Sequence, residues 1–178
     1  MRLRAGSRKL VLSLHLTLSV GWIGALAAYL AMDVATVTSG DPATLQAAYA
    51  GMDLIVRTVI VPLALATLAT GIVISLGTRW GLFRHYWVAI SLVLTVVATG
   101  VLLFETRTIA ALAQVAADPA TTAEELARLN STLVHSLGGL VVLLVILVLN
   151  VYKPRGLTRH GWRKQRGSPT NRYSREFP

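Results

Sequence analysis

Cysteine is absent from this chain of 178 residues. Its absence excludes disulfides, thiolate chemistry, and zinc or iron–sulfur sites ligated by cysteine. A glycine-rich phosphate loop and a His-Glu-x-x-His helix are missing as well, which removes the sequence basis for a P-loop nucleotide site or a zinc peptidase. No serine in the apolar runs has an evident histidine and acid partner for nucleophilic catalysis. The lack of these motifs therefore indicates a protein that is not an enzyme.

Charged residues are missing from four long apolar runs. The runs without Asp, Glu, Lys or Arg are Leu10–Met32, Thr58–Leu76, Tyr86–Phe104 and Leu129–Tyr152. A bilayer core of ~30 Å needs about 20 such residues in a helix, and a helix satisfies its own backbone polar groups in lipid. The sequence predicts an all-α membrane protein, a four-transmembrane-helix bundle with spans at about 10–32, 54–76, 84–104 and 131–152. Residues 1–152 form one domain in this prediction.

The charges divide unequally between the two sides of the predicted bundle. Fourteen of the 17 Lys and Arg residues lie before the first run, between the second and third, or after the fourth, with Glu176 the one acid among them. The other two connections carry three arginines against seven of the eight acidic residues. Excess Lys and Arg marks the cytoplasmic side. The sequence predicts a multi-pass protein of the bacterial inner membrane with both termini in the cytoplasm.

The net charge of +9 follows from the same distribution. Because the basic residues flank membrane spans, anionic lipid headgroups are the partner that they predict, and a nucleic-acid partner is not expected. Residues 153–178 mix Arg, Gly, Pro and Ser with few apolar residues. This composition predicts a basic, disordered cytoplasmic tail.

Both connections on the acidic side contain the tetrapeptide Asp-Pro-Ala-Thr, at Asp41–Thr44 and at Asp118–Thr121. Asp as N-cap with Pro at the first helical position is typical of a helix start, and Thr122 with Glu125 fits a capping box. The sequence predicts that each connection ends in a helix that continues into the second or the fourth span as a short external extension. Pro62, inside the second span, is predicted to kink that helix.

Histidines within the spans are the candidates for a cofactor site, because ionisable groups are costly in the membrane. His15 and His85 lie toward the cytoplasmic ends of the first and third spans. Two imidazoles on different helices of a bundle are a usual ligand pair for haem b, and Trp22 lies where it could flank the ring. The alternatives are that His15 packs between helices and His85 lies at the interface, or that one imidazole serves a metal site or a proton relay.

A second polar group is predicted at the outer ends of the second, third and fourth spans. It consists of Asp53, Arg57, Glu105 and His135. Asp53 and Arg57 have the i,i+4 spacing of a helical ion pair, and a purely structural role follows from that. The alternative is an externally open pocket in which Arg57 and His135 donate hydrogen bonds to a small anion or to haem propionates.

Several strings resemble those of known membrane proteins. They are Leu14-His15, Gly21-Trp22-Ile23-Gly24, Gly81–Trp87 and Val151–Thr158. The first two resemble the opening helix of bacterial membrane proteins of the copper-resistance-D type. The last two are similar to actinobacterial four-helix integral membrane proteins of a family of unknown function, over most of the chain to about Gln165. The resemblance implies the four-helix topology and carries over one haem or copper ligand, His15.

The function predicted from the sequence is a non-enzymatic inner-membrane component that binds a ligand or forms part of a complex. Two alternatives stay open. One is a b-type haem electron carrier that uses His15 and His85. The other is a small-solute or metal transporter, which four helices would form as an oligomer.

Overall fold

The computed structural model describes residues 4–77, 81–129, 131–154, 156–158 and 162. Its helices are α1 (Ala5–Thr38), α2 (Pro42–Ile55), the π-helix η1 (Val56–Ile60), α3 (Val61–Gly77), α4 (Tyr86–Ala117), α5 (Ala123–Ala127) and α6 (Leu133–Tyr152). α2, η1 and α3 follow one another without a break, so the described residues form four long helical rods and the short helix α5. Most of the predicted tail lies outside the described residues.

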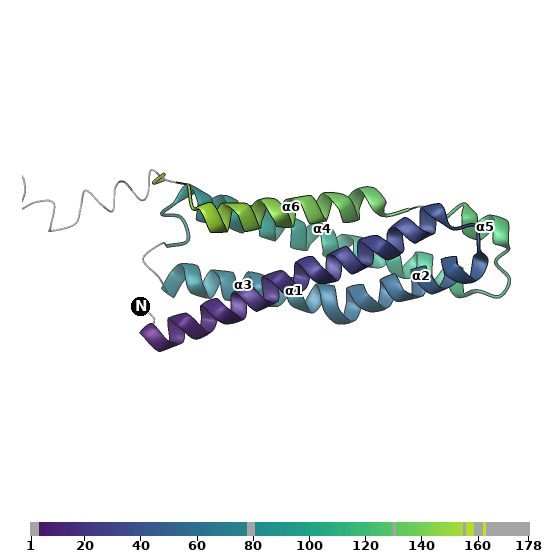
Figure 1. The fold of residues 1–178 in the computed structure, drawn as a ribbon, viewed down its shortest axis with the longest axis horizontal. Coiled ribbons are helices and arrows are strands. Elements are labelled where there is room, and N and C mark those ends of the chain that lie inside the picture. The colour runs from purple at the N-terminus through teal and green to yellow at the C-terminus, as the bar shows by residue number, and fades with distance from the viewer. Residues whose placement is uncertain (1–3, 78–80, 130, 155, 159–161, 163–178) are drawn as a thin grey trace, which may run out of the picture.

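The four rods form an up-and-down bundle. α1 packs against α2, α3 and α6, and α4 packs against α2, α3 and α6. Each rod is long and apolar enough to cross a bilayer, which confirms the predicted all-α, four-helix membrane bundle. The start of α1 and the end of α6 lie at one end of the bundle, and α2 and α5 lie at the other (Figure 1). We refer to the end with α2 and α5 as the distal end.

The distal end carries the helical extensions. The 34 residues of α1 span about 50 Å at 1.5 Å per residue, well beyond a bilayer core of about 30 Å. A small second core stabilises this end, where Leu45 and Tyr49 of α2 pack with Ala116 of α4 and Leu126 of α5.

The helix starts confirm two of the predicted caps and correct a third. The Asp41 carboxylate accepts a hydrogen bond from the Thr44 backbone N–H at 3.1 Å, and α2 continues through η1 into α3 as predicted. Thr122 and Glu125 form the capping box of α5. The second Asp-Pro-Ala-Thr does not start a helix, because Asp118 is the C-cap of α4 and its carboxylate accepts from the Ala120 N–H at 2.8 Å.

The predicted continuation of the second external helix into the fourth span is also wrong. α5 ends at Ala127, and α6 begins only at Leu133. Arg128 closes α5, its N–H donating to the carbonyl of Glu125 at 3.1 Å. The intervening segment brings the hydroxyls of Ser131 and Thr132 back toward α1.

The helix around Pro62 is continuous but changes its hydrogen-bond pattern. Proline lacks the N–H that would bond the preceding turn. The five residues of η1 stand just before it, and the Val61 N–H reaches back to the carbonyl of Val56. A π-helical turn of this kind is a frequent feature of functional sites. Here it places Val56 and Ile60, both almost fully buried, against the main core.

Candidate functional site

A pocket of about 340 Å³ lies inside the distal half of the bundle. All four rods contribute to its wall, through α1, the α2–η1 junction, α4 and α6. Its volume is at the low end of the roughly 300–1,000 Å³ that small-molecule sites usually have. The pocket can therefore hold one chain or one ring system of a ligand.

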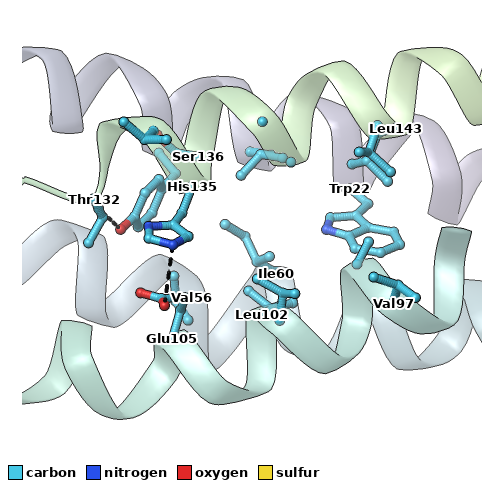
Figure 2. A pocket seen from close by; sticks show the side chains of 18 of the residues that line it. Trp22, Val56, Ile60, Val97, Leu102, Glu105, Thr132, His135, Ser136 and Leu143 are labelled. Carbon is cyan, nitrogen blue, oxygen red and sulfur yellow. Dashed lines mark hydrogen bonds and ion pairs between the residues drawn. The ribbon is translucent and has the colours of Figure 1, made fainter.

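Apolar atoms line most of the pocket, and its few polar side chains gather at one end, called here the polar end (Figure 2). Trp22, Val97 and Leu143 surround the apolar end, toward the middle of the bundle. Glu105 and His135 lie at the polar, distal end. Such a gradient suits an amphipathic molecule that has an apolar body and a single polar group.

The pocket opens sideways between α4 and α6. Val97 and Val101 of α4 line it and are 55% and 46% exposed. Val134 of α6 lines it and is 82% exposed, and Gly138, one turn further along, is exposed as well. The rim of the opening is thus apolar on both helices and lies within the span regions of α4 and α6. A molecule dissolved in the bilayer could reach the pocket through this opening without crossing water.

Glu105 and His135 face each other across the polar end of the pocket. The Glu105 carboxylate oxygen Oε1 lies 3.8 Å from His135 Nε2. The Glu105 side chain is 15% exposed and the His135 side chain is 57% exposed. A separation of 3.8 Å is too long for a direct hydrogen bond, for which 2.7–3.2 Å is usual. A third group can hydrogen-bond to both atoms if it approaches the pair from one side.

A fully buried carboxylate, Asp33, stands beside this polar end. Its side chain accepts hydrogen bonds from the hydroxyls of Ser131 at 3.3 Å, Thr132 at 3.0 Å and Ser136 at 2.7 Å. Thr132 also bonds the Tyr29 hydroxyl at 2.7 Å. These contacts tie the start of α6 to α1, and Tyr29, Thr132 and Ser136 themselves line the pocket.

Sequence reasoning missed this role of Asp33, which it counted only among the charges of the acidic side. A usable signal was present. Trp22, Leu26, Tyr29 and Asp33 recur at intervals of four, three and four residues, which places them on one helix face. An acid at the end of an inward-facing stripe predicts a buried carboxylate with polar partners, and the hydroxyl-rich start of the fourth run supplies them.

The structure divides the predicted outer polar group into two pairs. Arg57 Nε donates to the Asp53 carboxylate at 2.6 Å, as the i,i+4 spacing predicts, and the Arg57 side chain is half exposed. Glu105 and His135 form the other pair and line the pocket. Neither Asp53 nor Arg57 is among the residues that line it. An anion-binding role for Arg57 stays a prediction.

The residues predicted to hold haem lie in different surroundings. His15 packs between α1 and α3, where its Nδ1 is 3.0 Å from the Thr70 hydroxyl and its ring lies against Gly71. His85 is the N-cap of α4, and its backbone pairs with Leu157. Trp22 lines the pocket, whereas neither histidine does. Haem ligation by His15 and His85 stays a prediction.

Within the described part of the chain, no group of three or more His, Cys, Asp or Glu side chains could hold a metal ion. Comparisons of the chain with protein-family models, with curated proteins and with solved structures find no match. The likeness to the actinobacterial and copper-resistance-D-type membrane proteins therefore stays a prediction. The candidate function rests on the geometry of the pocket.

Proposed function

We propose that this protein is a non-enzymatic membrane component that binds a small, lipid-soluble ligand in the pocket of the distal half. The observation that carries the proposal is the lateral opening between α4 and α6, with an apolar rim at span depth. A ligand that partitions into lipid would exchange through it. Its apolar body would then be shielded by Trp22 and Leu143, and the side chains around Glu105 would bind its polar group.

We further infer that the distal end faces away from the cytoplasm, in a bacterial inner membrane. The excess of Lys and Arg in the terminal segments and in the connection between α3 and α4 supports this orientation. The pocket would then open to the outer leaflet. Reporter fusions after residue 178 should be active as cytoplasmic reporters and inactive as periplasmic ones. The reverse result would place the pocket in the inner leaflet.

The binding proposal is tested by filling the opening with a side chain. A Cβ added at Gly138 meets no atom within 4 Å, and this glycine borders the pocket. Gly138→Leu should thus narrow the opening without a clash. Gly100→Leu is the matched control, because Gly100 of α4 is also exposed with open space around it and does not line the pocket.

The measurement is mass spectrometry of the molecules that stay bound after detergent extraction and extensive washing. We expect the wild type and Gly100→Leu to retain a small lipid-soluble species in near-stoichiometric amount. Gly138→Leu should retain several-fold less. Equal retention by all three proteins, or no retained species in any of them, would contradict the proposal.

A further inference from the structure

We propose that the ligand carries a neutral hydroxyl as its polar group, and that Glu105 and His135 bind this hydroxyl between them. The inference rests on the proposed function, because it names the chemistry recognised at the polar end of the same pocket. The ligand class is a single-chain or prenyl-type lipid alcohol, with its hydroxyl at the distal end and its hydrocarbon directed toward Trp22.

The separation of the Glu105–His135 pair selects a group that both donates and accepts. When the Glu105 carboxyl is ionised, its Oε1 is a hydrogen-bond acceptor and not a donor. Nε2 of His135 is a donor in one of the two imidazole tautomers. Because the two atoms are 3.8 Å apart, an oxygen that lies to one side of the line joining them can be about 2.8 Å from each. A hydroxyl there donates to Glu105 and accepts from His135, so it satisfies both side chains at once.

The acids around the polar end exclude other common headgroups. A fatty acid would bring a third carboxylate close to Glu105 and Asp33, and like charges in a region of low dielectric repel. An ammonium group has three donors and no acceptor, so it cannot pair with the His135 tautomer that donates through Nε2. A two-chain phospholipid is too large for a pocket of about 340 Å³.

The depth of the pocket sets the length of the hydrocarbon. Trp22, at the apolar end, and Tyr29, at the polar end, are seven residues apart on α1, which corresponds to about 10 Å along the helix. A chain of roughly ten carbons therefore extends from the Glu105–His135 pair to the Trp22 ring. Trp22 is only 4% exposed, so molecules dissolved in the surrounding lipid contact it poorly.

These features define a quenching experiment in lipid nanodiscs. Three probes are compared: 11-bromoundecan-1-ol, 1-bromoundecane and 11-bromoundecanoic acid. Bromine quenches tryptophan fluorescence on contact, and in the bound alcohol the bromine would lie beside Trp22. The signal is the quenching measured in the wild type minus the quenching measured in the Trp22→Phe variant. This subtraction removes the contribution of the other tryptophans.

We expect the alcohol to half-saturate this signal at about a tenfold lower concentration than the alkane, because only the alcohol can hydrogen-bond to Glu105 and His135. The acid should bind more weakly than the alcohol. Glu105→Leu should raise the half-saturating concentration of the alcohol about tenfold and leave that of the alkane within about twofold. Glu105→Gln keeps an acceptor oxygen and should therefore retain most of the preference for the alcohol over the alkane.

The outcomes separate the two proposals. If alcohol and alkane quench Trp22 equally, or if Glu105→Leu weakens both probes alike, the hydroxyl site is refuted while ligand binding in the pocket stands. If the acid binds best, the headgroup assignment is refuted. If no probe quenches Trp22 in the wild type, and Gly138→Leu and Gly100→Leu are alike in lipid retention, both proposals fail.

Discussion

Replacing Asp33 tests whether the buried carboxylate holds α6 in place. Asp33→Ala removes the acceptor of two buried hydroxyls, those of Thr132 and Ser136, which are 5% and 4% exposed. Each hydroxyl loses a hydrogen bond to a carboxylate, and such a bond contributes roughly 1.5–3 kcal/mol, so the loss of both would cost at most about 6 kcal/mol. Both hydroxyls retain a second contact, to the Tyr29 hydroxyl at 2.7 Å and to the Leu133 carbonyl at 3.1 Å. The expected loss in the free energy of unfolding is therefore about 2–4 kcal/mol.

Asp33→Asn separates the hydrogen bonds from the shape of the side chain. Its amide oxygen can take the position that accepts from Thr132 and Ser136, and its NH₂ group can donate to the Ser131 hydroxyl. We expect this variant to lose less than about 1 kcal/mol. Asp41→Ala is the control, because Asp41 is an exposed carboxylate whose side chain caps α2. It should be less destabilised than Asp33→Ala.

The assay is equilibrium unfolding of the purified protein in mixed micelles, with far-ultraviolet circular dichroism as the signal. Hydrogen exchange at the start of α6 reports the local effect, and Asp33→Ala should raise it there more than in α3. The reasoning is refuted if Asp33→Asn is as unstable as Asp33→Ala. It is also refuted if neither substitution changes the free energy of unfolding.

Two further predictions concern the ends of the bundle. Hydrogen bonds from the Thr122 backbone N–H and hydroxyl hold the pKa of Glu125 below its ordinary value of 4.5; the stability that they add to α5 is fully present above that value and is lost as pH falls through the lower folded pKa. After correction for the intrinsic pH dependence of exchange, amide exchange in α5 of the wild type should thus rise in this acidic range. Glu125→Gln lacks the ionised carboxylate and should exchange faster than the wild type at neutral pH, so equal exchange of the two proteins at neutral pH would contradict the assignment. If His15 and His85 bind haem b, protein from haem-supplemented expression should show a Soret band that His15→Ala abolishes, and a colourless preparation would exclude the haem site.

The fold could be predicted from the sequence because lipid leaves few alternatives. A charge-free run such as Tyr86–Phe104 must satisfy its backbone internally and is long enough to cross, so its length and composition decide the outcome. The capping motifs in the sequence predicted the helix boundaries less well. Asp41 and Asp118 begin the same tetrapeptide, yet the first starts a helix and the second ends one. The difference comes from α4, which continues as a helix to Ala117 and leaves no room for a new start at Asp118.

The candidate site could be predicted only in part. Glu105 and His135 were recognisable as polar residues near span ends, and the structure brings them together. The pocket itself was not predictable, because it depends on how far α4 and α6 stand apart, which apolar periodicity does not encode. The pairing of Arg57 with Asp53 followed from their spacing, but which of the outer polar residues face the bundle interior depends on the rotation of each helix. The π-helical turn η1 affects that rotation for α2.

The register of the long helix from α2 to α3 depends on this turn. Buried side chains recur there at every fourth position, at Met52, Val56, Ile60 and Ala64. A regular α-helix turns 100° per residue, so a strict interval of four would carry the inward stripe about 40° further around with each step. The wider turn of η1 absorbs the excess. Removing one residue from it would leave the apolar composition intact but swing α2 by about 100° relative to α3. The number of residues in η1, more than their identity, thus sets which face of α2 meets α4.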